Sequence, residues 1–240
     1  MALGAGYRVT DDVMIGAAFH YYLGSSRLTS QRVFCDSIRT LGPPAECGVP
    51  NLLYAQVGEQ SITDYHGIGG AVGIIVTRGR VDLAASGRLN GRLRSGNSGG
   101  QTAMTQLPAQ LNVGVRVAAV PGIYLSGAAA YAGWGAANSS LLAAGKDGAR
   151  DTWAVGAGAE VLSTSIFKVR MPLRLGYRWR QLPFLSLGQG INEWAASGGL
   201  GFSLAHDRTT LDFAYEHGRR TAGAERETFS TLFAGLTVRP

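Results

Sequence analysis

Apolar and polar residues alternate one by one along most of this chain. The segment 167–181, "FKVRMPLRLGYRWRQ", is the clearest case, with large apolar residues at odd positions and basic residues at even positions. Successive side chains of a β-strand point to opposite faces, so the pattern predicts a strand with one apolar and one cationic face. A soluble core strand does not carry this much charge. We therefore expect the two faces to meet two different environments.

The same alternation predicts eleven strands, which begin near Leu3, Val13, Thr63, Arg80, Pro108, Ile123, Thr152, Ile166, Asn192, Thr209 and Glu227. Short turns alternate with long polar loops over 24–62, 94–107, 135–151, 182–191 and 219–226. Short connections on one side and long ones on the other are typical of bacterial outer-membrane barrels. We predict an all-β fold, a transmembrane antiparallel up-and-down β-barrel, as one domain over residues 1–240, with 24–62 as a long external loop.

Large aromatic residues cluster at the long-loop ends of the predicted strands. Trp153 and Trp194 follow long loops, Trp179 precedes one, and Tyr215 lies at the same end. Aromatic residues form girdles where a barrel crosses the membrane interface, so we predict that these four residues belong to one. The alternative, aromatic residues that fill a soluble core, does not predict this placement.

The predicted strand number is odd, whereas single-chain bacterial barrels normally have an even number. The chain begins inside a predicted strand, so we expect at least one strand before Met1 and 12–14 strands in the complete protein. The alternative is a further strand inside 24–62, for example at "PNLLYAQV".

The composition and the cysteine positions limit the classes of partner and of site that we expect. Glycine contributes 35 of 240 residues, about twice the usual share of roughly 7%, and only 16% of residues are charged. The net charge is +6, but the basic residues stand among apolar ones inside strands, so we do not expect nucleic acid as a partner. Cys35 and Cys47 share one polar stretch, which is consistent with a local disulfide in an oxidising compartment or with two free thiols. We expect no metal site and no cofactor.

The C-terminal third resembles a known family. The pieces "LRLGYR", "LPF", "GGLGF", "LDFAYEHG" and "GLTV", within 171–240, are similar to the end of FadL-like outer-membrane proteins, the long-chain fatty-acid and hydrocarbon transporters. The resemblance implies a barrel that binds hydrophobic molecules and inserts through the barrel assembly machinery. The chain departs from that family in three ways: it shows no plug segment, it is about three strands short, and it ends in Pro240 rather than an aromatic residue.

Charged residues on the non-lipid face are the candidate site, as side chains that line the lumen. They are Arg88, Arg92, Arg116, Glu160, Lys168, Arg170, Arg174, Arg178, Arg180, Asp212 and Glu216. The arginines either draw an anionic group through the channel or form a structural network with the acids, and we expect Lys168 to face Glu160.

No Ser-His-Asp set is evident, so we expect no enzyme and no catalytic residues. We predict passive uptake of hydrophobic, carboxylate-bearing compounds across the bacterial outer membrane. The partners would be the lipid bilayer, the assembly machinery and a hydrophobic small-molecule ligand. The alternatives are a non-specific or anion-preferring aqueous porin, and a structural or adhesive surface barrel.

Overall fold

The computed structural model describes residues 1–32, 57–97, 99–100, 102–143, 145, 147–162, 165–166, 169–186, 188–204 and 209–238. Most of these residues form strands. The strands are β1 (Ala2–Arg8), β2 (Val13–Arg32), β3 (Val57–Arg78), β4 (Val81–Asn90), β5 (Arg92–Asn97), β6 (Thr102–Gln106), β7 (Gln110–Val120), β8 (Ile123–Ala132), β9 (Thr152–Val161), β10 (Ser165–Ile166), β11 (Val169–Arg170), β12 (Leu173–Ser186), β13 (Gln189–Leu204), β14 (Thr209–Ala222) and β15 (Glu225–Val238). A short 3-10 helix, η1 (Trp134–Ala137), leads into α1 (Asn138–Ala143).

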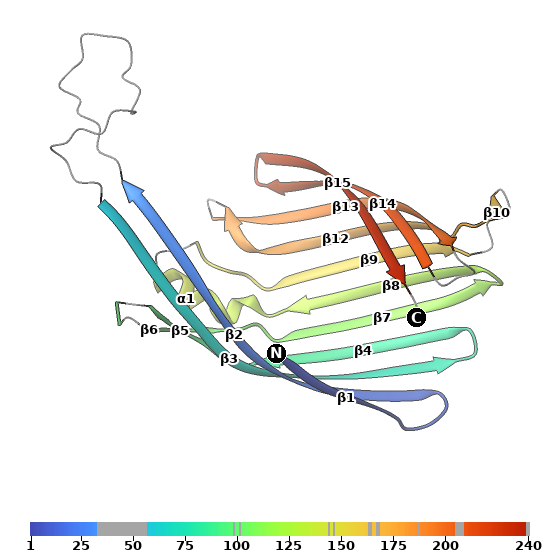
Figure 1. Cartoon of the computed structure of the whole chain (residues 1–240), viewed down its shortest axis with the longest axis horizontal. Helices are drawn as coiled ribbons and strands as arrows, with labels where there is room; N and C mark the ends of the chain where they lie inside the picture. The colour runs from blue at the N-terminus through green and yellow to red at the C-terminus, as the bar shows by residue number, and fades with distance from the viewer. Residues whose placement is uncertain are drawn as a thin grey trace, which may run out of the picture.

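One antiparallel sheet contains nearly all the strands, in the order β1-β2-β3-β4-β7-β8-β9-β12-β13-β14-β15. These eleven strands correspond in order to the eleven that the alternation predicts, so the up-and-down fold is confirmed. The sheet curves into an open arch, with β1 and β15 at its two edges (Figure 1). These two edge strands do not pair with each other in the described part of the chain.

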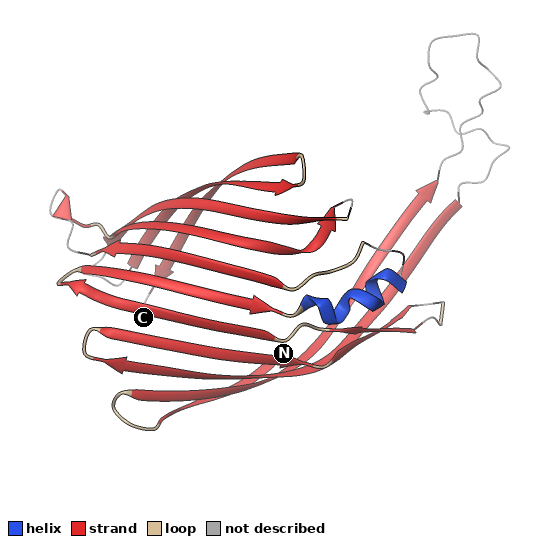
Figure 2. Cartoon of the chain, turned by 180° about the vertical axis from the view of Figure 1, so that it is seen from behind, coloured by secondary structure: helices blue, strands red, loops and turns tan. Residues whose placement is uncertain are grey.

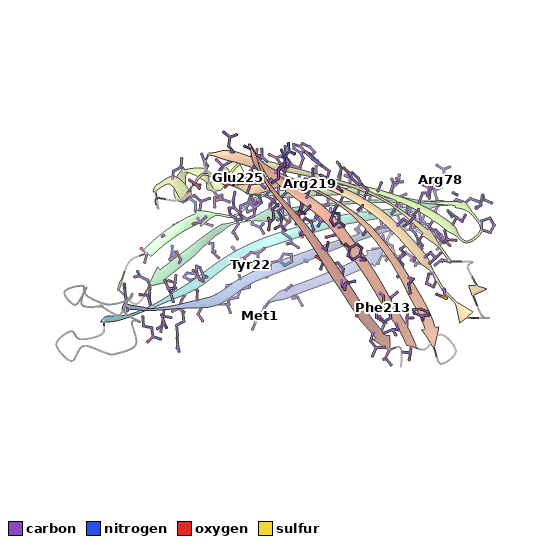
Figure 3. All side chains as sticks on the ribbon, turned by 90° about the horizontal axis from the view of Figure 1, so that it is seen from above. Met1, Tyr22, Arg78, Phe213, Arg219 and Glu225 are labelled. Atoms are coloured by element: carbon purple, nitrogen blue, oxygen red, sulfur yellow. The ribbon has the colours of Figure 1, made fainter. Side chains whose placement is uncertain are left out.

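The strand register separates the sheet into two faces. We call one the apolar face; it carries Tyr7, Ile15, Ile74, Val113, Leu125, Leu175, Tyr215 and Leu232 across the strand path. Its side chains are strongly exposed, for example Leu175 at 69% and Leu232 at 82%. A continuous, uncovered apolar surface of this kind is typical of a barrel wall that faces lipid. We call the opposite face the polar face. Figure 3 shows the sheet as an arch, with Met1 and Phe213 near its two open edges.

The ends of the strands differ from the prediction. β2 and β3 stay paired from Arg27↔Ile62 to Arg32↔Val57, so the outer parts of the range 24–62 are strand and not loop. A polar sequence suffices here, because the backbone ladder alone pairs the two strands where they extend past β5. Residues 33–56, with Cys35 and Cys47, lie outside the described residues, so the disulfide stays a prediction.

The other long connections are also more ordered than predicted. The range 94–107 holds the β5–β6 hairpin, and 135–151 holds η1 and α1. α1 lies beside β6, where the Ser140 hydroxyl donates to the Met104 carbonyl at 3.3 Å (Figure 2). β14 and β15 continue to a tight turn at Gly223, whose φ of +58° favours glycine. No helix among the described residues is long and apolar enough to cross a membrane.

The segment 167–181 is not one strand. β12 begins at Leu173, while Val169–Arg170 pairs with Ser165–Ile166 in a separate small hairpin. Pro172 stands at the break, because it has no N–H to donate to the ladder. Its carbonyl still accepts a hydrogen bond from the Gly201 N–H at 3.0 Å.

Candidate functional site

An apolar groove of about 540 Å³ lies on the polar face of β1, β2, β3, β4 and β7. Gly6, Gly16, Gly73 and Gly114 form its floor, and Met14 and Ile75 supply its apolar walls. The only polar side chains that line it belong to Ser86 and Asn112. A groove of this size and lining matches the pockets that bind small hydrophobic molecules.

Small residues create this groove. The register row Gly6, Gly16, Gly73, Ser86 and Asn112 crosses five strands, and its first three members have no side chain. A Cβ on Gly73 would meet the Ala85 carbonyl oxygen at 3.5 Å and the Ser86 Cβ at 3.6 Å, which are ordinary contacts. The glycine is therefore not forced by crowding at this position. Its effect is to leave space above the sheet.

Arg88 lies on β4 beside this groove. It is half-buried and follows Ser86 along the polar face, opposite Ala71 and Gln110. Within the described residues, no acid lies within ion-pair distance of Arg88. Arg88 is thus a free cation at the edge of an apolar groove.

The C-terminal half of the polar face is filled instead by ion pairs. Glu193, whose side chain is fully buried, accepts from Arg178 Nη1 at 2.5 Å, from Arg180 Nε at 2.7 Å and from Arg220 Nε at 2.5 Å. Arg178 also donates two hydrogen bonds to Glu216, at 3.0 and 2.8 Å. We call these five residues the Glu193 network. Such bidentate and shared contacts fix the side chains in place.

A second set of ion pairs lies farther along β12. Arg174 donates to Glu160 Oε1 at 2.8 Å and to Asp212 Oδ1 at 2.7 Å. Arg116 reaches Glu160 at 3.7 Å and packs its guanidinium over the Tyr124 ring, 4.0 Å from the ring centre. Most of the predicted charged residues therefore form ion pairs with one another. This is the structural network that the sequence left as one of two alternatives.

Three of the predicted lumen residues, Lys168, Arg170 and Arg92, either lie outside the described residues or are placed differently from the prediction. Glu160 is opposite Arg174 in the ladder, and Lys168, its expected partner, lies outside the described residues. Arg170 belongs to β11 and not to β12. Arg92 turns away from Arg88, as a correction to the sequence prediction.

The cause is an extra residue at Gly91. The register runs Gly69↔Asn90 before it and His66↔Arg94 after it, so the bulge shifts β5 by one position. A one-residue shift moves every following side chain to the other face. A Cβ on Gly67 would meet Leu93 at 3.3 Å, which places Leu93 on the polar face and Arg92 on the apolar side.

Side chains bridge the sheet at this bulge. The Tyr22 hydroxyl donates to Asn90 Oδ1 at 2.7 Å, and Asn90 Nδ2 donates to the Pro108 carbonyl at 2.7 Å. Gln106 Nε2 donates to the Asn90 carbonyl at 2.9 Å. Tyr22 reaches across because Gly69 lies between the strands, and a Cβ there would come within 2.6 Å of Asn90. The bonds hold the wall together where the ladder is interrupted.

The predicted girdle residues all lie on the apolar face; the three tryptophans lie toward the long-loop end of their strands, whereas Tyr215 lies in the middle of β14. Trp153 is 52% and Tyr215 is 48% exposed, while Trp179 and Trp194 are half-buried and directly opposite each other in the ladder. Trp194 stacks on Tyr177 with ring centres 6.5 Å apart. These positions are consistent with a girdle, which stays a prediction.

One carboxylate outside the strands has a defined environment. Asp151 accepts from the Tyr131 hydroxyl at 2.7 Å and from the Gly135 N–H at 2.7 Å. These two donors, the hydroxyl first, lower the pKa of Asp151 below its ordinary value. The contacts fasten the segment that contains η1 to the start of β9.

Sequence reasoning missed Glu193, Arg220, Tyr22 and Asn90. Because Glu193 and Trp194 are adjacent in a strand, their side chains point to opposite faces, which places Glu193 on the polar face. It does not say which arginines lie beside it, because that depends on the register between β12, β13 and β14. The bulge at Gly91 carries only a weak sequence indication, a glycine within a strand pattern.

No protein-family model matches this sequence, and no curated protein matches it. Solved structures do match. The CymD monoaromatic hydrocarbon channel has a TM-score of 0.59 at 14% identity, over 98% of this chain and 71% of that one. The Ralstonia pickettii toluene transporter TbuX has a TM-score of 0.55 at 18% identity, over 99% and 66%. A Pseudomonas aeruginosa FadL homologue has a TM-score of 0.58 at 12% identity, over 98% and 64%.

At these low sequence identities, the structural matches establish the fold of the chain. The chain has the fold of FadL-type barrels, as the resemblance in its C-terminal third predicts. It spans between 64% and 71% of the length of these three proteins.

Proposed function

We propose that this protein is a bacterial outer-membrane barrel for the passive uptake of small hydrophobic compounds. The observation that carries the proposal is the apolar, glycine-floored groove on the polar face, with a volume of about 540 Å³. An aqueous pore does not require such a surface, because contact between water and apolar walls is unfavourable. The proposal is supported by the similarity in fold to a monoaromatic hydrocarbon channel and to a toluene transporter.

The apolar face supports the membrane location. Exposed large apolar residues lie on ten of the eleven strands of the path, and β13 adds the half-buried Trp194 and Leu200 on the same face. Burying such residues in lipid is favourable at about 25 cal/mol per Å². The groove lies on the opposite face, so a molecule in it would be shielded from the lipid by the sheet.

The finer proposal is that part of the cargo carries a carboxylate. It depends on Arg88, a cation beside the groove that has no carboxylate partner among the described residues. The arginines of the C-terminal half do not support it, because Arg174, Arg178 and Arg180 already hold protein carboxylates.

Hydrocarbon uptake tests the function directly. In cells whose own uptake channels for aromatic hydrocarbons are deleted, expression of the protein should restore the entry of radiolabelled toluene. Gly73→Phe places a ring in the groove and should lower this uptake roughly tenfold, the equivalent of 1.4 kcal/mol in an equilibrium. Gly87→Phe is the matched control, because Gly87 is on the same strand pair but faces outward and has open space around it.

Permeability to small neutral sugars separates the proposal from the aqueous porin. Liposomes that contain the protein should not swell in these sugars. Swelling at porin rates, together with unchanged toluene uptake in Gly73→Phe, would contradict the proposal and favour an open pore. Unchanged uptake without swelling would place the hydrophobic path elsewhere.

A further inference from the structure

We propose that the apolar face of β12–β15 holds a phosphorylated lipid of the outer leaflet. This inference goes beyond uptake, and it shares with the proposed function only the position of the protein in the outer membrane. It is based on an outward-facing groove, a chain of polar side chains beyond it, and two cations that no acid accompanies.

The groove has a volume of about 660 Å³. Gly198 forms its floor, and the surrounding walls come from Leu175, Leu200, Phe213, Tyr215 and Leu232. The lack of a side chain at Gly198 makes the hollow, since its flanking partners in the ladder, Leu175 and Tyr215, are both large. This surface faces away from the polar face, so its natural occupant in a membrane is an acyl chain.

Polar side chains follow the groove along β14. The Tyr215 hydroxyl and Ser230 Oγ are 3.0 Å apart, and His217 Nδ1 is also 3.0 Å from Ser230 Oγ. Ser230 lies opposite His217 in the ladder, so the three groups form one exposed polar step on an otherwise apolar surface. Trp194, stacked on Tyr177, borders this step. An amphiphile that enters the groove with its chain meets hydrogen-bonding groups and aromatic rings next.

Two cations lie beyond the step. Arg219 follows on β14, and Arg226 lies on β15 opposite Thr221; both are exposed and both are on the apolar side of the sheet. Neither has an ion-pair partner among the described residues. Figure 3 shows Phe213 and Arg219 at separate heights along β14, with Arg78 far away at the end of β3.

The acids of these strands are all on the other face. Within the described residues of β12–β15 they are Glu193, Asp212, Glu216, Glu225 and Glu227, and each belongs to the polar face by its register. The lipid-facing side therefore carries uncompensated positive charge near one end. Such a basic patch next to an apolar groove complements an anionic lipid headgroup.

The spacing fits one leaflet. Tyr215 and Arg219 are four residues apart on one strand, a separation of about 13 Å at ~3.3 Å per residue. The hydrocarbon core of a bilayer is ≈ 30 Å thick, so one leaflet is roughly 15 Å deep. At the ~35–45° tilt of barrel strands this separation spans about 10 Å of depth, so an acyl chain at Gly198 and a phosphate at Arg219 both lie within one leaflet. Both cations lie next to the turn that joins β14 and β15. That turn is at the end of the sheet that carries the β2–β3 hairpin and α1 (Figure 1), which we take as the external side.

Native mass spectrometry tests the site. The protein is purified from outer membranes in a neutral detergent and titrated with lipid A or with its dephosphorylated counterpart. We expect the phosphorylated form to bind at least about tenfold more tightly. The double variant Arg219→Gln/Arg226→Gln should lose this preference. Gly198→Leu, which fills the groove, should weaken both lipids. Arg78→Gln, an equal charge change at the opposite end, should have no effect.

Three results would overturn the proposal. In the first, the double variant keeps the preference for phosphate. In the second, both lipids bind equally, so that the groove holds only an acyl chain. In the third, the wild-type protein is a dimer that Gly198→Leu dissociates, so that the face belongs to a second copy. Toluene uptake, measured in parallel, should be unchanged in all these variants, so failure of the uptake proposal and failure of the lipid proposal are distinguishable.

Discussion

The two halves of the polar face solve the same packing problem in opposite ways. Over β1, β2, β3, β4 and β7, glycine and other small residues leave a groove of about 540 Å³. Over β12, β13 and β14, long arginine and glutamate side chains fill the space and hold one another, with Glu193 at the centre. The register is unbroken across the row from Gly6 to Asn112 and across the pairs that bring Arg180, Glu193 and Arg220 together, so side-chain size and charge make the difference there.

The two halves are therefore suited to different roles, the C-terminal half to structural support and the groove half to holding a small molecule. A buried carboxylate that three guanidinium groups hold is costly to rearrange, so the C-terminal half is suited to remain fixed. The groove has few polar groups to satisfy, so its contents are exchangeable. Four changes to the protein test this contrast, and the first has the largest expected effect.

Glu193→Gln should destabilise the protein by about 3 kcal/mol, because three arginines lose the carboxylate that compensates them. The free energy of unfolding in urea, measured in detergent micelles, gives the result. The counterpart in the groove half is Asn112→Ala, whose amide donates only one 3.4 Å hydrogen bond, to Ser86. It should cost about 1 kcal/mol or less. Equal losses in the two halves would remove the distinction between them.

Arg88→Gln should lower the uptake of an aromatic carboxylate such as benzoate roughly tenfold and leave toluene uptake unchanged. The reason is that Arg88 lies beside the groove with no carboxylate partner in the described part of the chain, and an uncharged hydrocarbon gains nothing from its charge. Arg174→Gln is the control, since Arg174 is already held by Glu160 and Asp212. If Arg88→Gln leaves benzoate uptake at its original rate, the carboxylate part of the proposal is wrong.

Tyr22→Phe should destabilise the protein by about 1 kcal/mol, the value of one hydrogen bond, because its hydroxyl no longer reaches Asn90. Amide hydrogen exchange should rise mainly at Gly91 and Leu107, whose own bonds close the interrupted ladder. Tyr21→Phe, a change of the neighbouring residue on the apolar face, provides the comparison. Exchange that rises evenly over all strands would show that the bridge has no local role.

Asp151 should give the smallest effect, and a pH-dependent one. Its folded-state pKa is lowered, so its contribution to stability is present above the unfolded-state pKa of about 3.9 and is lost as the pH falls through the folded-state value. The Gly135 amide, which donates to this carboxylate, should then exchange faster once the pH falls through this lowered folded-state pKa. Asp151→Asn should remove that pH dependence, and a persistent dependence would assign it to another group.

Much of the fold is predictable from the sequence, because a period of two residues is a direct consequence of strand geometry. The apolar and polar faces of β12 follow from the alternation of Leu173, Leu175 and Tyr177 with Arg174 and Arg178. Part of the strand order follows too, since a short turn brings consecutive strands such as β1 and β2, or β3 and β4, into antiparallel pairing.

The ends of the strands and the site are less predictable. The polar segments 25–32 and 57–62 look like a loop, yet they stay in the β2–β3 ladder because backbone pairing does not require apolar side chains. Arg92 has the spacing of Arg88 but reaches the opposite side, since one residue at Gly91 resets the register. Glu193 gains its three partners from strand pairing, which no local pattern contains.

The β2–β3 hairpin has a practical consequence. Beyond Thr63, where β5 ceases to pair with β3, six further rows of the two-stranded ribbon run to Arg32↔Val57 with no other strand beside them. At ~3.3 Å per residue, the ribbon extends about 20 Å past the sheet. A segment inserted at its far end would therefore be held away from the sheet. A peptide epitope introduced after Arg32 would be carried clear of the lipid surface, where an antibody on intact cells reaches it without contact with the barrel wall.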